Sequence, residues 1–123
     1  MSPSRMNRAL LQDIRTALDD IACYTAGLDY GIFTQVRQIQ HAVLFNLHII
    51  GEAANRLDAG FRAQHPAVPW SAAIGMRNVI VHGYFAVNLE IVWKTVTEDL
   101  PPFKAQIEAL LAQPDGVIDD DND

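Results

Sequence analysis

Four residues with complementary chemistry lie close together in the pattern R-N-x-x-x-H-x-Y, which runs from Arg77 to Tyr84. Arg77 carries a permanent planar cation whose fork of donors suits a phosphate group. His82 has the side chain best able to move protons near neutral pH, while Asn78 adds an amide and Tyr84 a phenol. These residue types at this spacing suit phosphodiester chemistry that needs no metal.

RNA can be cut without a metal when its own 2′-hydroxyl attacks the adjacent phosphate. The reaction needs a base, an acid for the leaving oxygen, and stabilisation of the charge that develops on the phosphate. His82 can serve as base or acid, Arg77 can hold the phosphate, and Asn78 can orient His82 or donate to a phosphate oxygen. One histidine cannot easily fill both proton-transfer roles at once. A symmetric dimer that brings two His82 residues to one cleft would solve this.

The elements that must position these residues are predicted to be helices throughout, because no window shows the two-residue alternation of strands. The first helix is expected to start near Ser4 or Asn7 and to end before Gly27, which fits a C-terminal stop. After a connector over residues 28–33, Thr34 is the expected N-cap of a second helix. That helix reaches about Leu57 and carries a sustained apolar seam: Val36, Ile39, Val43, Leu47, Ile50, Ala54 and Leu57.

A second apolar face on the same helix, made by Leu44, Phe45 and Ile49, predicts that it is central or lies in an oligomer interface. After a break at Gly60, Pro66 and Pro69, with room for one short helical turn, a further helix is expected. The fold class is therefore an all-α, up-and-down helical bundle that forms a dimer.

The motif helix is predicted to begin with Ser71 as its N-cap and to end near Gly83. On a straight helix Arg77 and Tyr84 share a face, but His82 lies about 140° around the axis from Arg77. The three side chains converge only if the helix distorts or ends near Gly83, which a glycine permits.

The C-terminal part is predicted to contain a helix capped by Asn88. Its expected apolar face comprises Leu89, Val92, Trp93, Val96 and Leu100. Two consecutive prolines, Pro101 and Pro102, should kink or restart this helix. The apolar residues that follow should close the bundle: Phe103, Ile107, Leu110 and Leu111.

The chain has 123 residues and a formal charge of −6, but five of its fifteen acidic residues follow Gln113, and without them the charge falls to −1. We therefore expect one helical domain over residues 1–113 and a solvated, disordered acidic tail over 114–123. A decoy or partner-binding tail is the alternative. The acidic balance argues mildly against nucleic-acid binding. No apolar run approaches the roughly 18 residues of a membrane helix, and no signal-peptide core is apparent, so a soluble cytoplasmic protein is expected.

Several other residues have plainer interpretations. The single cysteine, Cys23, cannot form an internal disulfide and is expected to be buried filler. Trp70 and Trp93 are expected in the core, with base stacking as the alternative. His48 and Glu52, four residues apart, could ligate a metal, but no second ligand pair accompanies them. We therefore expect neither metal nor cofactor, and Glu52 is a candidate partner for Arg77 or His82.

From about Asp13 to Leu111 the chain resembles the HepT-like branch of the HEPN (higher eukaryote and prokaryote nucleotide-binding) superfamily. A single R-x-x-x-x-H would be a weak signal, whereas several landmarks in order on an all-helical chain are strong. The landmarks are Ile49-Ile50-Gly51-Glu52-Ala53-Ala54, Pro69-Trp70, Ile74-Gly75-Met76-Arg77-Asn78, His82-Gly83-Tyr84, Val92-Trp93 and Asp99-Leu100-Pro101.

The resemblance implies a metal-independent endoribonuclease toxin that acts on RNA through Arg77 and His82, supported by Asn78, Tyr84 and Glu52. It also implies an antitoxin, a small nucleotidyltransferase called MntA, that silences the toxin by transferring AMP to Tyr84. Some relatives in the superfamily are inactive. The alternative is therefore a catalytically silent module that binds a nucleotidyltransferase or a nucleotide.

Overall fold

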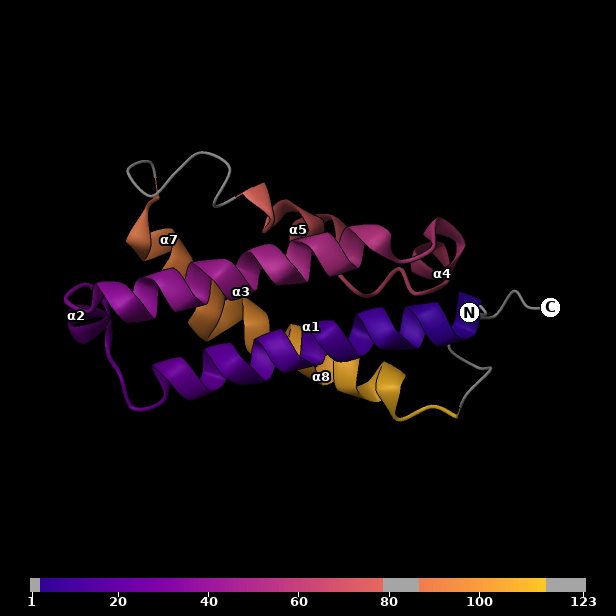
Figure 1. Cartoon of the computed structure of the whole chain (residues 1–123), viewed down its shortest axis with the longest axis horizontal. Coiled ribbons are helices and arrows are strands. Elements are labelled where there is room, and N and C mark those ends of the chain that lie inside the picture. Colours follow the sequence, from indigo (N-terminus) through magenta and orange to yellow (C-terminus); the bar gives the residue numbers. More distant parts are fainter. Residues whose placement is uncertain (1–2, 79–86, 115–123) are drawn as a thin grey trace.

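A computed structural model describes residues 3–78 and 87–114, and every regular element in these two stretches is helical. This confirms the all-α class. The described elements, shown in Figure 1, are α1 (Pro3–Thr25), α2 (Tyr30–Phe33), α3 (Arg37–Arg56), α4 (Ala59–Gln64), α5 (Trp70–Gly75), α7 (Leu89–Lys94), a π-helical turn η2 (Thr95–Asp99) and α8 (Leu100–Leu111).

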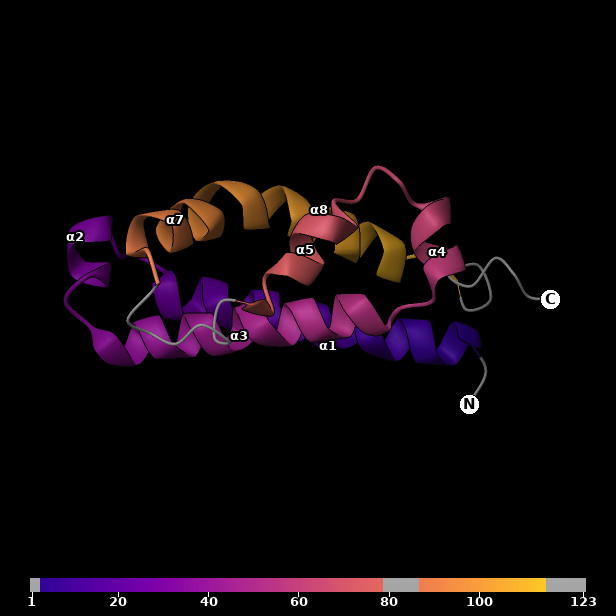
Figure 2. The same ribbon diagram turned by 90° about the horizontal axis from the view of Figure 1, so that it is seen from above.

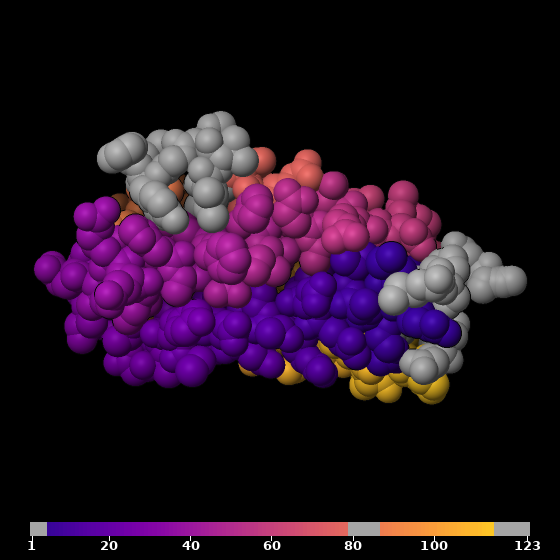
Figure 3. All heavy atoms as spheres, viewed as in Figure 1, coloured from indigo at the N-terminus to yellow at the C-terminus, as the bar shows by residue number. Residues whose placement is uncertain are grey.

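The helices form two layers. The two longest, α1 and α3, lie side by side and antiparallel, joined through the short α2 (Figure 1). Seen from above, α5, α7 and α8 form a second layer over this pair (Figure 2). On the face shown in Figure 3, α1 and α3 supply most of the described surface. The central α3 therefore packs against α1 on one side and supports α5 on another.

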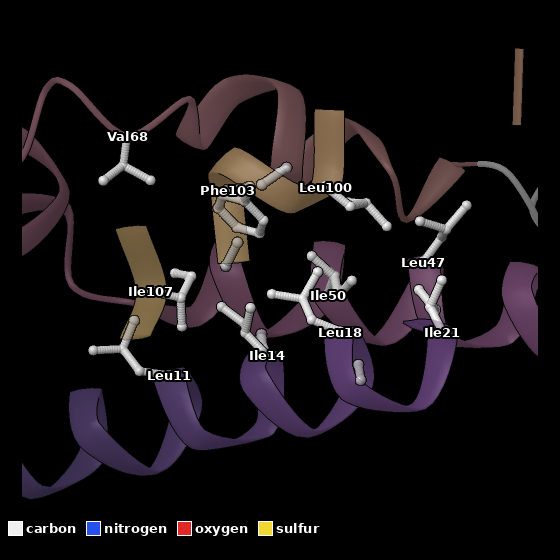
Figure 4. Close-up of a cluster of buried hydrophobic side chains, with 14 of the residues drawn as sticks. Leu11, Ile14, Leu18, Ile21, Leu47, Ile50, Val68, Leu100, Phe103 and Ile107 are labelled. Carbon is white, nitrogen blue, oxygen red and sulfur yellow. The ribbon is translucent and has the colours of Figure 1, made fainter. Parts of the chain in front are cut away.

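The core lies between the two layers and contains an apolar stripe along α1. Side chains of α1 point toward those of α3 and α8 (Figure 4). The residues are Leu11, Ile14, Leu18 and Ile21 of α1, Leu47 and Ile50 of α3, and Leu100, Phe103 and Ile107 of α8. All of these are almost completely shielded from solvent. Each such side chain stabilises the fold by about 1.5–3 kcal/mol through burial, as an upper estimate. The bundle is thus held by apolar packing.

Two predicted N-caps are wrong. Thr34 is not the cap of the second helix, because Asp29 caps the short α2 by accepting a 2.8 Å hydrogen bond from the Ile32 amide, and Thr34 ends that helix. The long α3 then starts at Arg37 without a side-chain cap. Ser71 lies inside the first turn of α5, which begins at Trp70. Val36 and Pro69 occupy the N-cap positions of α3 and α5, and neither makes a side-chain capping hydrogen bond.

The end of α1 confirms one expectation and contradicts another. Gly27 has φ of 76°, the left-handed conformation expected of a residue that stops a helix. Cys23, however, is exposed rather than buried. It is two residues beyond the buried Ile21, about 200° around the helix axis, so it faces away from the core.

The C-terminal helical segment follows the predicted pattern. Asn88 caps α7 by accepting hydrogen bonds from the amides of Glu90 and Ile91. The helix then widens into η2, where the Leu100 amide donates to the Thr95 carbonyl five residues earlier, and restarts as α8 with the two prolines in its first turn. Because proline has no N–H and its ring collides with the carbonyl four residues earlier, an α-helix cannot run unbroken through this point. The wider turn removes that conflict.

Polar contacts join the first and last helices. The Lys104 ammonium lies 2.8 Å from an Asp19 carboxylate oxygen, and this hydrogen bond raises the pKa of Lys104 above its ordinary value. Nearer the chain ends, the Arg8 guanidinium donates to the carbonyls of Leu111 and Gln113. The two terminal helices of the described chain are therefore tied together at both ends of their contact. Among the described residues, no helix combines the length and apolarity that crossing a membrane requires.

Candidate active site

The motif begins in a turn rather than within a helix. The helix α5 ends at Gly75, and the Arg77 amide donates to the Ile74 carbonyl at 3.2 Å, so Arg77 lies in the turn that follows. Its side chain is half-buried, and that of Asn78 is exposed. The single motif helix from Ser71 to Gly83 is therefore interrupted at its middle. His82 and Tyr84 lie outside the described residues.

The backbone of Arg77 packs directly against the central helix α3 at Gly51. A Cβ atom added to Gly51 would lie 2.3 Å from the Arg77 amide nitrogen and 2.8 Å from its Cα. Real Cβ atoms essentially never come this close to backbone, so only glycine permits the contact. The sequence does contain a signal for this role: an isolated glycine inside a helix costs about 1 kcal/mol relative to alanine, and here the close contact offsets that cost.

His48, one turn before Gly51 on α3, contacts the same residue on its carbonyl side. Its ring nitrogen Nδ1 lies 2.9 Å from the carbonyl oxygen of Arg77. A carbonyl oxygen only accepts hydrogen bonds, so in this contact Nδ1 must carry the proton. The sequence had offered His48 only as a metal ligand, because a contact with a backbone carbonyl 29 residues away leaves no trace in local spacing.

Glu52 lies beside His48 rather than beside a described part of Arg77. A Glu52 carboxylate oxygen is 3.9 Å from His48 Nε2, and both side chains are partly open to solvent. The pair is ionic only when the imidazole is protonated. Glu52 thus reaches Arg77 through His48 and its hydrogen bond. No group of three or more potential metal-ligating His, Cys, Asp or Glu side chains occurs within residues 3–78 and 87–114.

Within the described residues, no carboxylate forms an ion pair with the Arg77 guanidinium. The ion pairs of Lys104 with Asp19 and of His48 with Glu52 both lie in this part of the chain, and neither involves Arg77. A guanidinium that is half-buried and not neutralised by a carboxylate suits the binding of an anion.

In the described part of the chain, the cavity between α5 and α8 and the cavity between α1 and the C-terminal segment are both larger than the hollow beside His48, but their chemistry does not suit phosphate. One, of about 480 Å³, lies between α5 and α8 and is bordered by Glu98 and Asp99. The other, of about 330 Å³, lies between α1 and the C-terminal segment and has a mainly apolar lining. The smaller hollow of about 160 Å³ between α1 and α3 has a mixed charged lining, with Asp13 and Glu52 beside His48 and Arg56. Negative side chains in the first and apolar walls in the second disfavour an anion.

Comparison with known proteins shows which family the chain matches. The family model described as "Ribonuclease HepT-like" matches residues 14–110, a span that contains the motif as well as His48, Gly51 and Glu52. No solved structure matches the chain significantly.

Individual relatives agree with the family match. The chain is 38% identical over 101 residues to a protein of Methanocaldococcus jannaschii named as a candidate RNase, MJ1380, covering 82% of this chain and 93% of the relative. It is 36% identical over 106 residues to a protein of Thermococcus cleftensis named a probable ribonuclease HepT, covering 86% and 96%. A second candidate RNase of M. jannaschii, MJ0125, is 34% identical over 109 residues, covering 89% and 94%. The chain therefore belongs to the HepT-like ribonuclease family.

Proposed function

We propose that the protein is a metal-independent endoribonuclease whose catalytic residues are Arg77 and His82. Family membership supports RNA as the substrate class. The structural observation that carries the proposal is the seating of Arg77 on α3, through the close approach at Gly51 and the hydrogen bond from His48. A cation held on a rigid helix is suited to fixing a phosphate for reaction.

In the proposed reaction the ribose 2′-oxygen bonds to phosphorus as the bond between phosphorus and the 5′-oxygen breaks. A base removes the 2′-proton, and an acid gives a proton to the departing 5′-oxygen. His82 fills one of these roles, and Arg77 stabilises the charge that develops on the phosphate oxygens. Asn78 and Tyr84 are proposed to support the site by binding RNA or orienting His82.

We further propose a homodimer in which the two motifs share one cleft, because one His82 per chain cannot readily supply both acid and base. The outer face of α3 supports this arrangement. Phe45 is 57% exposed there, and it lies one turn before His48 on the same helix. Burying such a large apolar side chain against a second copy would stabilise the pair and would bring the two Arg77 peptides toward each other.

The products should carry the signature of 2′-hydroxyl attack. We expect a 2′,3′-cyclic phosphate on one fragment and a 5′-hydroxyl on the other, and cleavage in EDTA should proceed at the rate seen without it. An RNA with 2′-deoxyribose at the cut position should resist cleavage, because the nucleophile is missing. Mass spectrometry of the fragments and gel assays with the substituted substrate measure this. Equal cutting of the deoxy-substituted RNA, or activity restored only by a divalent ion, would overturn the mechanism.

Regulation is proposed to act at Tyr84, through AMP transfer from a partner nucleotidyltransferase of the MntA type. An added AMP would place a phosphate near Arg77, where it would compete with RNA for the guanidinium. Incubation with the partner and ATP should therefore add one AMP per chain at Tyr84 and stop cleavage, as measured by peptide mapping and RNA assay.

The matched variant Tyr84→Phe removes only the phenolic acceptor. This variant should take up no AMP and should escape silencing by the partner. Modification at another residue, or silencing of Tyr84→Phe to the same extent as the wild type, would contradict the proposed regulation.

A second candidate function is that of a catalytically silent partner module, and the acidic balance of the chain, −6 in total, favours it. The same partner would then bind without any RNA being cut. Expression of the chain alone distinguishes the two candidates, because the ribonuclease should arrest growth and the silent module should not.

A further inference from the structure

The contact between His48 and the Arg77 carbonyl can hold the Arg77 backbone in one orientation. The Nδ1 atom is attached to the carbon that follows Cβ, so its N–H leaves the ring close to the helix. At 2.9 Å from the carbonyl oxygen, it makes a hydrogen bond of normal length to the carbonyl of Arg77, a residue in the turn after α5. The contact fixes the plane of the peptide between Arg77 and Asn78.

This peptide plane determines where the functional side chains leave the backbone. On its amide side, Arg77 is confined by the close approach at Gly51, and on its carbonyl side by His48. Together the two contacts restrict both backbone dihedral angles at Arg77. Misplacing a catalytic group by about 1 Å can lower a rate by about 100-fold, so such restriction has catalytic value.

Glu52 completes the arrangement by restricting the ring of His48. Its carboxylate lies 3.9 Å from Nε2, on the opposite edge of the imidazole from the Arg77 carbonyl. When both ring nitrogens carry protons, the imidazole donates from Nδ1 to the Arg77 carbonyl while its charge pairs with the Glu52 carboxylate. Glu52, His48 and the Arg77 carbonyl thus make successive contacts from the surface of α3 to the backbone of the motif.

We propose that His48 is a positioning residue of the ribonuclease, which orients the Arg77 guanidinium toward RNA phosphate by holding the Arg77 carbonyl. The proposal rests on the proposed ribonuclease function. It also replaces metal binding as the interpretation of the His48 and Glu52 pair. His48 does not itself touch the substrate in this scheme, and its effect on cleavage passes through Arg77.

Two substitutions of similar shape separate hydrogen bonding from packing. In His48→Asn the amide nitrogen takes nearly the position of Nδ1 and can still donate to the Arg77 carbonyl, whereas in His48→Leu the side chain has a similar branch but no donor. We expect kcat/KM for RNA cleavage to fall by about tenfold or more in His48→Leu and by no more than about threefold in His48→Asn. Single-turnover assays of the full chain measure both.

The chain offers a matched control for lost stability. Gln40, on the same helix, donates a 2.8 Å side-chain hydrogen bond to the Phe33 carbonyl, about 12 Å along α3 from His48. Gln40→Leu removes a comparable contact away from the motif, so it should lower thermal stability about as much as His48→Leu while kcat/KM stays at the wild-type level. If Gln40→Leu loses cleavage in step with its stability, the effect of His48→Leu is structural and the positioning role is rejected.

A spectroscopic measurement tests the contact without relying on RNA cleavage. The 13C resonance of the Arg77 carbonyl reports whether it accepts a hydrogen bond. It should move upfield in His48→Leu and stay near its wild-type position in His48→Asn. Equal kcat/KM for His48→Leu and wild type, or an unmoved resonance, would overturn the proposal while leaving the ribonuclease function intact. A wild-type chain that cuts no RNA would instead refute the proposed function, and the resonance would still show whether His48 fixes the peptide.

Discussion

Replacing Arg77 with alanine is expected to lower RNA cleavage by about 10²-fold or more, because it removes the cation that stabilises the transition-state charge. The fold should survive. The contacts that seat this residue on α3 are made by its backbone amide, Cα and carbonyl, all of which alanine retains. Arg77→Lys keeps the charge but loses the planar fork, so its activity should lie between those of the wild type and of Arg77→Ala.

The same loss is expected for His82→Ala, which removes a proton-transfer group worth about 10²–10⁴-fold. Because the two residues act in one step, the double variant should be scarcely slower than the more impaired single variant. Single-turnover cleavage measures these rates, while circular dichroism and sedimentation check that the fold and oligomeric state are unchanged. Wild-type cleavage by either alanine variant would remove that residue from the mechanism.

Gly51→Ala is expected to have the second large effect, by displacing the Arg77 backbone from α3. The sign of the change in stability is informative, because replacing glycine with alanine inside a helix normally stabilises a protein by about 0.5–1 kcal/mol. Here the new Cβ would lie 2.3 Å from the Arg77 amide nitrogen, and overpacking of this kind costs about 1–3 kcal/mol. We expect a net loss of stability together with a fall in cleavage larger than the fraction unfolded can explain.

Gly75→Ala is the matched control for this experiment. Gly75 is also helical, at the end of α5, and a Cβ added there meets no atom within 4 Å. This variant should melt at or slightly above the wild-type temperature and retain its activity. A Gly51→Ala protein that is as stable and active as Gly75→Ala would show that the close approach does not hold Arg77 in place.

Local periodicity was enough to predict the scaffold that carries the candidate site. The seam on α3 was predicted from steps of three and four residues, and its central members Val43, Leu47, Ile50 and Ala54 are buried. The stop at Gly27 and the cap at Asn88 were predicted from conformational preferences that act within a few residues. Such features depend only on neighbouring positions along the chain.

The features that sequence reasoning missed depend on distant contacts or on competition between similar residues. The link from His48 to the Arg77 carbonyl joins α3 to a turn 29 residues later in the chain, and no periodicity encodes it. The predicted connector contains the short helix α2, which Asp29 caps and Thr34 ends, so Thr34 does not cap the helix that starts at Arg37. Cys23 was assigned to the core by residue type alone, although its angular position on α1 places it outside.

The pairing of the two terminal helices bears on when the enzyme can first become active. The apolar stripe of α1 packs against α8 as well as α3, and Arg8 binds carbonyls more than a hundred residues away, at Leu111 and Gln113. During synthesis the core of α1 is therefore complete only once α8 has been made. Until then the support beneath Arg77 lacks its final packing. A ribonuclease built in this way would acquire its site only after the residues up to Gln113 have left the ribosome, well after the motif itself has been synthesised.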